Sequence, residues 1–184
     1  RQLAAWNKNA LTRELSLAVN VSGQQFRQHD FVDRVAAVIR AHPVDPSRLK
    51  LELTESVVLS DIDDVVKKMH ALKTIGVKLS MDDFGTGYSS LAYLKQLPLD
   101  QLKIDRSFVR DIASDHNDAV MVQTIIGLAK NFRLDVIAEG VEPAEQLERL
   151  TALGCEFGQG FYFSKPVPAE EASQLLQLPV EVLA

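Results

Sequence analysis

The feature that most constrains the fold is a regular alternation of two hydrophobic patterns along the chain. Apolar residues at every second position, which are typical of β-strands, occur at 15–20, 49–53 and 77–82, and further strands are predicted at 99–104, 134–139 and 155–157. Helical spacing occurs in the intervening and flanking segments, at 3–10, 31–39, 62–75, 120–132, 145–153 and 170–178, with a short helix ending at 95. Strict strand–helix alternation predicts parallel strands joined by helical crossovers, so the fold class is α/β, either an open sheet or a closed β/α barrel.

The length of the chain and the faces of its strands favour different members of this class. Six strands in 184 residues are fewer than the eight of a closed barrel, which typically needs ~250 residues, so length favours an open sheet. The strands, however, are apolar on one side only, as where Leu51 and Leu53 alternate with Lys50 and Glu52. An open sheet covered by helices on both faces would be apolar on both sides. We therefore expect a (β/α)8 TIM-like barrel, with polar residues gathered at the carboxyl ends of its strands.

Composition and charge limit the classes of function. Hydrophobic residues make up 46% and charged residues 24% of the chain, which are globular averages and argue against disorder. The net charge of −5 argues against a partner of DNA or RNA polymers, which would require a positive face. Cys155 is the only cysteine, which excludes an internal disulfide and favours a cytoplasmic domain. No repeat or linker divides the chain, so we expect one domain over residues 1–184.

Polar side chains gather where the predicted strands end. Nearly all of them offer oxygen atoms: Asn20, Glu52, Asp82, Asp83, Lys103, Asp105, Glu139 and Gln159. Crowded carboxylates raise each other's pKa unless cations neutralise them, so a divalent metal site is the simplest interpretation. Carboxylate and amide oxygens select Mg²⁺, Mn²⁺ or Ca²⁺ over zinc or copper. This many carboxylates indicates two ions roughly 3.5–4 Å apart, the arrangement that supports phosphoester hydrolysis.

Each of these residues also has a structural alternative. Asp82 and Asp83 precede a Gly-Thr-Gly segment and could shape a turn, while Asp105 could cap a short helix. Asn20 could end its strand by bonding to the backbone. Lys103 could balance buried acids instead of orienting or deprotonating a water. The coincidence of all of them at strand ends, rather than any one residue, favours a site.

Two further acidic residues lie a few positions beyond predicted strands. Glu55 comes three residues after Glu52, and capping of the next helix or support of a neighbouring loop is favoured there over direct metal ligation. Glu142 precedes Pro143 and fits the first turn of a helix, where the helix dipole stabilises an acid. Both residues remain candidates for the same site.

Seven different short motifs are distributed along essentially the whole chain, at 20–22, 51–56, 81–91, 102–109, 136–142, 158–160 and 164–166. The most specific of them is Asp-Asp-Phe-Gly-Thr-Gly-Tyr at 82–88. Together they resemble the EAL family, bacterial domains that hydrolyse the second messenger cyclic di-GMP. The alternative within this family is a non-catalytic cyclic di-GMP receptor, although such members usually lose metal ligands that are present here. A more distant alternative is an unrelated Mg²⁺-dependent barrel that abstracts a proton with Lys103.

The resemblance implies a (β/α)8-type barrel that uses Mg²⁺ or Mn²⁺, as two ions, to hydrolyse cyclic di-GMP to linear pGpG. By motif, five residues look like metal ligands: Asn20, Glu52, Asp82, Asp83 and Glu139. Lys103 resembles the group that orients the attacking water or helps to deprotonate it. Asp105 and Gln159 would line the same mouth, and Glu142 would reach the metals through water. Glu55 resembles the residue that anchors the Asp-Phe-Gly-Thr-Gly loop.

The resemblance also implies partners and shows one departure from the family pattern. We expect a homodimer and an upstream sensory or cyclase-type domain, in a parent protein that could also carry a membrane anchor. The Glu-Ala-Leu segment that names the family lies upstream of the first helix, and this sequence begins with Arg1 inside that helix. We therefore expect the N-terminal strand or strands and one ligand to be missing from this sequence, and the intact parent to be the active phosphodiesterase.

Overall fold

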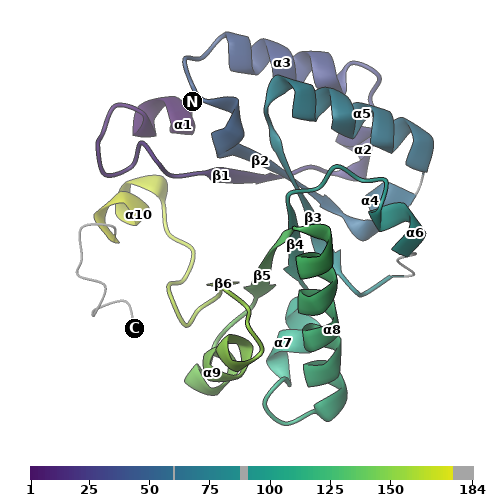
Figure 1. The fold of residues 1–184 in the computed structure, drawn as a ribbon. Helices are drawn as coiled ribbons and strands as arrows, with labels where there is room; N and C mark the ends of the chain where they lie inside the picture. The colour runs from purple at the N-terminus through teal and green to yellow at the C-terminus, as the bar shows by residue number, and fades with distance from the viewer. Residues whose placement is uncertain (60, 88–90, 176–184) are drawn as a thin grey trace. The chain divides into compact units, whose positions relative to one another are not determined.

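The computed structural model describes residues 1–59, 61–87 and 91–175, in which strands and helices alternate (Figure 1). The strands are β1 (Leu17–Asn20), β2 (Leu49–Thr54), β3 (Lys78–Phe84), β4 (Gln101–Ile104), β5 (Asp135–Glu139) and β6 (Phe157–Gln159). The helices are α1 (Gln2–Trp6), α2 (Gly23–Phe26), α3 (Phe31–Arg40), α4 (Glu55–Leu59), α5 (Ile62–Ile75), α6 (Leu91–Leu94), α7 (Arg106–Arg110), α8 (His116–Phe132), α9 (Ala144–Ala152) and α10 (Ala169–Leu175). A 3-10 turn, η1 (Pro46–Arg48), precedes β2.

The chain forms two compact units. The first contains Arg1–Met81 and Gly87–Asp100, and the second contains Asp82–Thr86 and the described residues from Gln101 onward. The strand order is β1-β2-β3 in the first unit and β3-β4-β5-β6 in the second, because β3 contributes to both. The pairs β1/β2, β4/β5 and β5/β6 are parallel, which confirms the α/β class. The expectation of one domain over residues 1–184 stays a prediction.

The core of the first unit lies where α3 and α5 pack together and β2 and β3 supply apolar side chains. Its fully buried side chains include Leu53, Met69, Leu72 and Leu79. Helix α5 begins at Asp61, whose carboxylate accepts a hydrogen bond from the Asp64 amide at 3.3 Å. This pairing of an N-cap with apolar residues at helical spacing explains why the predicted helix 62–75 is confirmed at both ends.

The end of α5 provides a test of the fold. Gly76 has φ 98°, and an added Cβ would lie 3.3 Å from the Cβ of Pro46. We expect Gly76→Ala to destabilise the protein by about 1–2 kcal/mol, because side chains disfavour left-handed backbone, which lowers the melting temperature by roughly 2–4 °C per kcal/mol. The control is Gly127→Ala within α8, where no atom lies within 4 Å of the added Cβ and melting should not fall. Equal melting curves for the two variants would contradict this account.

The second unit is built on β4 and β5, against which α7 and α8 pack. Leu102, Ile104, Val122, Ala129 and Ala138 are fully buried there. Polar residues are buried on the same strands, since Gln101 and Lys103 are only 6% and 3% exposed. This burial agrees with the expectation that the strands are apolar on one side only, since a polar face of β4 is buried as well.

The structure moves one or both bounds of each predicted strand by one or two residues, and hydrogen bonds explain the shift at two of them. The strand expected at 155–157 lies at Phe157–Gln159, because Gly154 turns the chain at φ 82° and the Cys155 amide bonds back to Leu150. The strand expected at 15–20 begins at Leu17, because the Leu15 carbonyl accepts two hydrogen bonds from the Arg48 guanidinium, at 2.6 and 2.8 Å. A local hydrogen bond accounts for the first shift and a side chain 33 residues away for the second, and neither can be read from the period-two pattern.

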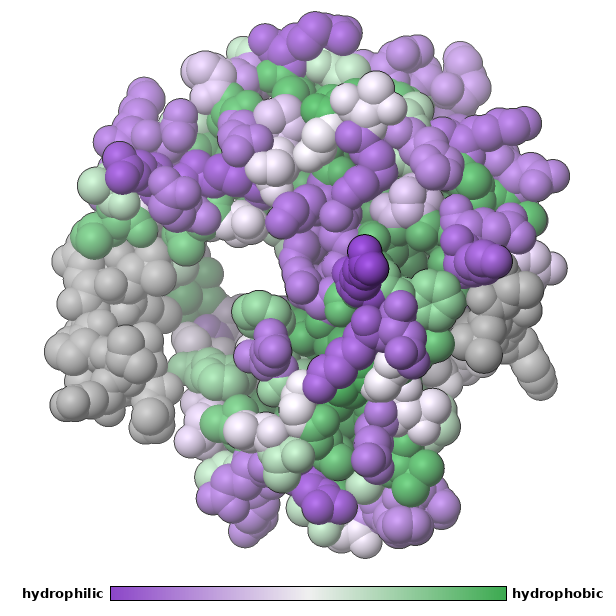
Figure 2. Space-filling view, viewed as in Figure 1, coloured by the Kyte–Doolittle hydropathy of each residue, from purple (hydrophilic) through white to green (hydrophobic). Residues whose placement is uncertain are grey.

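Short helices and the surface complete the fold. Helices α2, α4 and α7 are each about one turn long and were not predicted from the hydrophobic periodicity, and residues 176–178 of the last expected helix lie outside the described residues. In the part of the chain that is described, no helix has the length and apolarity to cross a bilayer. Hydrophilic side chains cover most of the face in Figure 2, with hydrophobic ones in smaller groups between them.

Candidate metal centre

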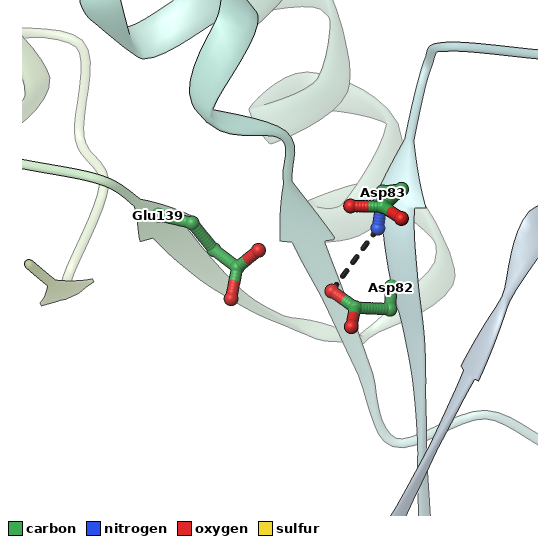
Figure 3. Close-up of side chains that lie close together, drawn as sticks. All are labelled: Asp82, Asp83 and Glu139. Atoms are coloured by element: carbon green, nitrogen blue, oxygen red, sulfur yellow. Dashed lines mark hydrogen bonds between the residues drawn. The ribbon is translucent and has the colours of Figure 1, made fainter. Parts of the chain in front are cut away.

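Three carboxylates converge in the second unit. Asp82 and Asp83 come from the end of β3, and Glu139 comes from the last position of β5. Each offers one oxygen within 4.8 Å of the others, and all three side chains are half-buried. Figure 3 shows the Glu139 carboxylate pointing toward the two aspartates. The parallel strand order predicts this convergence, because strand carboxyl ends meet at one edge of a sheet.

The backbone at Asp83 directs the two neighbouring carboxylates. Asp83 has φ 54°, a left-handed conformation that Asp adopts more readily than most residues. Its amide donates to Asp82 Oδ1 at 3.1 Å, and its carbonyl accepts from the Thr86 hydroxyl at 2.8 Å. The turn role considered for these aspartates is therefore present, and it serves to place their carboxylates in the cluster.

Lys103 lies among these acids. Its Nζ atom is 3.0 Å from Asp82 Oδ1 and 2.7 Å from Glu139 Oε1, and its side chain is only 4% exposed. Glu139 Oε1 also accepts a hydrogen bond from Gln159 Nε2 at 3.0 Å. These two ion pairs are the contacts that the alternative role of Lys103, balance of acids, requires. They are also compatible with a catalytic role, because they hold the ammonium group between Asp82 and Glu139.

Asp105 both caps a helix and adjoins the cluster. It is the N-cap of α7, and its Oδ1 accepts from the amide of Ser107 at 2.9 Å and from the Ser107 hydroxyl. Burial acts to raise the pKa of Asp105, but the hydrogen bonds from Ser107 and from Asp83 outweigh it and hold that pKa below its ordinary value. Burial raises the pKa of Asp83, with contributions from the charge of Asp82 and contact with Asp105.

The raised pKa of Asp83 predicts a stability effect of Asp83→Asn. An acid with a raised pKa in the folded state stabilises the fold below its unfolded pKa, and this contribution is lost as pH rises through the folded pKa. At pH 7 the ionised Asp83 therefore costs stability without metal, and Asn, which also tolerates left-handed backbone, removes that cost. We expect a higher melting temperature than wild type at pH 7 in EDTA, and no gain well below pH 3.8, the ordinary pKa of an Asp, where both states are protonated. A gain that is equal at both pH values would contradict the electrostatic cause.

The remaining predicted ligands lie in the first unit. Asn20, the last residue of β1, is the register partner of Glu52 in β2; Asn20 is exposed and Glu52 is 8% exposed. Glu55 is the first residue of α4 and is only 3% exposed. Its Oε2 atom accepts a hydrogen bond from the Gly87 amide at 3.3 Å. An added Cβ on Gly87 would lie 2.5 Å from the Glu55 carboxylate, so the close approach requires glycine. The hydrogen bond between Glu55 and Gly87 is the contact that loop support requires, and both this role of Glu55 and ligation by Asn20 and Glu52 stay predictions.

Two open cavities adjoin the carboxylates of the second unit. One of about 570 Å³ is lined by Asp83, Thr86, Asp105, Arg106, Glu139, Gly140 and Gln159. The other, of about 970 Å³, also reaches Asp105, Arg106 and Gln159 and extends past Glu142. Sequence reasoning missed Arg106 and Gln146 in these linings. Arg106 was visible only as a neighbour of Asp105, and Gln146 carried no signal.

The donor set fits a hard divalent cation. Three half-buried carboxylates within 4.8 Å offer anionic oxygens of the kind that Mg²⁺ and Mn²⁺ prefer. The Lys103 ammonium shows that this position attracts positive charge, since it contacts Asp82 and Glu139 together. Asp82, Asp83 and Glu139 would hold the ion in this unit.

Comparison with known proteins agrees with the geometry. The EAL domain family model matches residues 1–166. The chain is 44% identical over 171 residues to the bifunctional diguanylate cyclase/cyclic di-GMP phosphodiesterase MucR of Pseudomonas aeruginosa, covering 93% of this chain and 25% of MucR. It is 42% identical over 163 residues to the cyclic di-GMP phosphodiesterase NbdA of the same organism, covering 89% and 21%. The chain thus spans about a quarter of the length of these relatives.

Solved structures share the fold. The PaMucR phosphodiesterase in complex with c-di-GMP has a TM-score of 0.89 and 43% identity, covering 93% of this chain and 69% of that one. The EAL domain of Mycobacterium smegmatis DcpA has a TM-score of 0.90 and 40% identity, covering 97% and 81%. This likeness confirms the β/α-barrel class, of which the described chain holds six strands. With the family match over residues 1–166, it shows that the chain belongs to the EAL domain family.

Proposed function

We propose that the protein hydrolyses one phosphodiester bond of cyclic di-GMP to give linear pGpG, in a reaction that depends on divalent metal ions. The observation that carries this proposal is the cluster of Asp82, Asp83 and Glu139 in a chain of the EAL family, with Lys103 paired to Asp82 and Glu139. Support also comes from MucR and NbdA, which are named as cyclic di-GMP phosphodiesterases.

The proposed cofactor is a pair of Mg²⁺ or Mn²⁺ ions. The proposed ligands are Asn20, Glu52, Asp82, Asp83 and Glu139. Klebsiella pneumoniae BlrP1, which has 32% identity and a TM-score of 0.79 and is covered over 42% of its length, was solved as a manganese/cy-diGMP complex. When bound, such ions supply a water of lowered pKa and positive charge against the phosphate.

Among the chain's own groups, Lys103 has the proposed catalytic role. As an ammonium it orients the attacking water by N–H donation, and as a neutral amine it accepts the proton of that water. The contacts with Asp82 and Glu139 fix its position, so orientation costs little reorganisation during the reaction. Gln159 fixes the Glu139 carboxylate in turn, by donating to the same oxygen that Lys103 contacts.

Asp105 and Glu142 complete the proposed mouth of the site. Asp105 is held by Ser107 and faces both cavities, so its carboxylate is placed to accept a hydrogen bond from substrate or water. Glu142 lines the larger cavity and is exposed there, which suits contact through water rather than direct ligation. Glu55 is proposed to keep the loop at Gly87 in place.

The wider setting of this domain is also proposed. We propose a cytoplasmic domain that works as a homodimer, in a parent protein with an upstream sensory or cyclase-type domain. The support is that the chain spans about a quarter of relatives such as MucR, whose name includes a diguanylate cyclase activity. Anchoring of the parent to a membrane belongs to the same proposal.

The test is turnover by the full-length protein. Cyclic di-GMP is incubated with the protein and Mg²⁺ or Mn²⁺, and nucleotides are separated by chromatography. We expect linear pGpG to accumulate and EDTA to stop its formation, because the carboxylates need a cation to activate water. Calorimetry that shows cyclic di-GMP binding without product, with or without metal, would overturn the proposal in favour of a non-catalytic receptor.

A further inference from the structure

Gln146 is a buried polar residue of α9 that the proposed mechanism does not use. Its side chain is 5% exposed, and both polar atoms are hydrogen bonded. Oε1 accepts from the backbone amide of Glu142 at 2.9 Å, and Nε2 donates to the backbone carbonyl of Arg110 at 2.9 Å. One side chain therefore joins the segment that follows β5 to the end of α7.

The segment after β5 is fixed on its other side by backbone contacts. The Val141 amide donates to the Gln159 carbonyl at 3.1 Å, and the Val141 carbonyl accepts from the Tyr162 amide at 2.9 Å. An added Cβ on Gly160 would overlap the backbone of Val141. Gln146 thus supplies a further support at Glu142, separate from the contacts that Gln159 and Tyr162 make with Val141.

The residues that Gln146 joins belong to one cavity wall. Arg110, Glu142 and Gln146 all line the open cavity of about 970 Å³, together with Arg106 and Lys165. This cavity places two carboxylates, those of Asp105 and Glu142, among cations, so small shifts between the Glu142 and Arg110 backbones change the spacing of opposite charges. The carboxylate cluster itself is held by Lys103 and the Gln159 amide, not by Gln146.

We propose that Gln146 is a positioning residue that sets the spacing of the Glu142 and Arg110 sides of this cavity and thereby the affinity for the cyclic dinucleotide. The inference rests on the proposed function of the site. One planar amide, which accepts one hydrogen bond and donates another, fixes two backbones at once, and a partly buried backbone group that loses its partner loses part of its stabilisation. Removal of the amide should therefore alter KM for the substrate and leave the metal requirement unchanged.

The test compares Gln146→Met, Gln146→Glu and a control, Gln123→Met on the exposed face of α8, in the full-length protein. Met removes both hydrogen bonds at similar size, whereas Glu keeps the acceptor for the Glu142 amide and places an oxygen against the Arg110 carbonyl. We expect KM for cyclic di-GMP to rise at least roughly tenfold in both Gln146 variants, since each of them loses at least one of the two hydrogen bonds. kcat and the half-saturating Mn²⁺ concentration should stay within about twofold, as for the control.

Hydrogen exchange of the Glu142 amide gives a readout that does not depend on turnover. It should exchange at least roughly tenfold faster in Gln146→Met than in wild type, and remain protected in Gln146→Glu and in the control. Faster exchange with unchanged KM would overturn the proposal, as would a loss in kcat alone that follows a loss of folded protein. If wild type gives no turnover, the proposed function fails, and calorimetric affinity for cyclic di-GMP replaces KM, with the same tenfold difference required.

Discussion

Replacement of Glu139 by Gln is expected to lower kcat/KM for cyclic di-GMP by at least about a hundredfold. The substitution keeps the size of the side chain but removes one of the three charges whose oxygens lie within 4.8 Å of each other. Mutation of residues that only support metal ligands typically lowers metal affinity or activity roughly 10–100-fold. Loss of the charge of a ligand itself should lower them further. The half-saturating Mn²⁺ concentration, measured by steady-state turnover at increasing Mn²⁺, should rise together with the loss in rate.

The folded state should be little affected by the same change. The introduced amide keeps an oxygen that Lys103 and Gln159 can still contact, and Asp82 continues to neutralise Lys103. The matched control is Glu148→Gln on the exposed surface of α9, which should retain full turnover and metal response. A Glu139→Gln protein with wild-type turnover would remove this carboxylate from the metal site and overturn the proposed ligand set.

The site could be predicted from the sequence only as far as strand geometry reaches. Asp82, Lys103 and Glu139 lie at or near the ends of consecutive strands, so their meeting at one edge follows from the alternation of strands and helices. Which carboxylates pair with Lys103 could not be predicted, because that depends on burial and side-chain rotamers. The 2.7 Å contact with Glu139 and the left-handed backbone of Asp83 are visible only in the structure.

The ends of helices and strands could be predicted where their causes are local in the sequence, and not where they are distant. Asp61 and Gly76 mark the ends of α5 by local hydrogen bonding and backbone conformation, so the predicted bounds were right. The start of β1 was wrong because Arg48, 33 residues beyond Leu15, takes the carbonyl that the pattern assigned to the sheet. Gln146 had no sequence signal for a similar reason, since its partners are backbone groups of Glu142 and Arg110.

Replacement of Lys103 by Met is expected to produce the largest loss of stability, and this loss should depend on metal. The ammonium group neutralises Asp82 and Glu139 while only 4% exposed, and its removal leaves two poorly hydrated carboxylates facing each other. Breaking a buried ion pair by removing one partner typically costs about 3–5 kcal/mol. In EDTA, thermal unfolding should therefore begin roughly 6–20 °C lower than in wild type, at 2–4 °C per kcal/mol. Lys67→Met, on the exposed surface of α5, should melt like wild type.

Mn²⁺ separates the two roles considered for Lys103. A cation bound by Asp82, Asp83 and Glu139 supplies the positive charge that the Met variant lacks, so Mn²⁺ should raise its melting temperature more than that of wild type. Hydrolysis should nevertheless stay at least about a hundredfold below wild type at saturating Mn²⁺, since general acid–base groups contribute typically 10²–10⁴-fold. If Mn²⁺ restored both stability and turnover, Lys103 would serve only to balance the acids, and the proposed water-orienting role would be wrong. Stability restored without turnover requires a contribution of the lysine to the reaction that charge neutralisation by metal cannot replace.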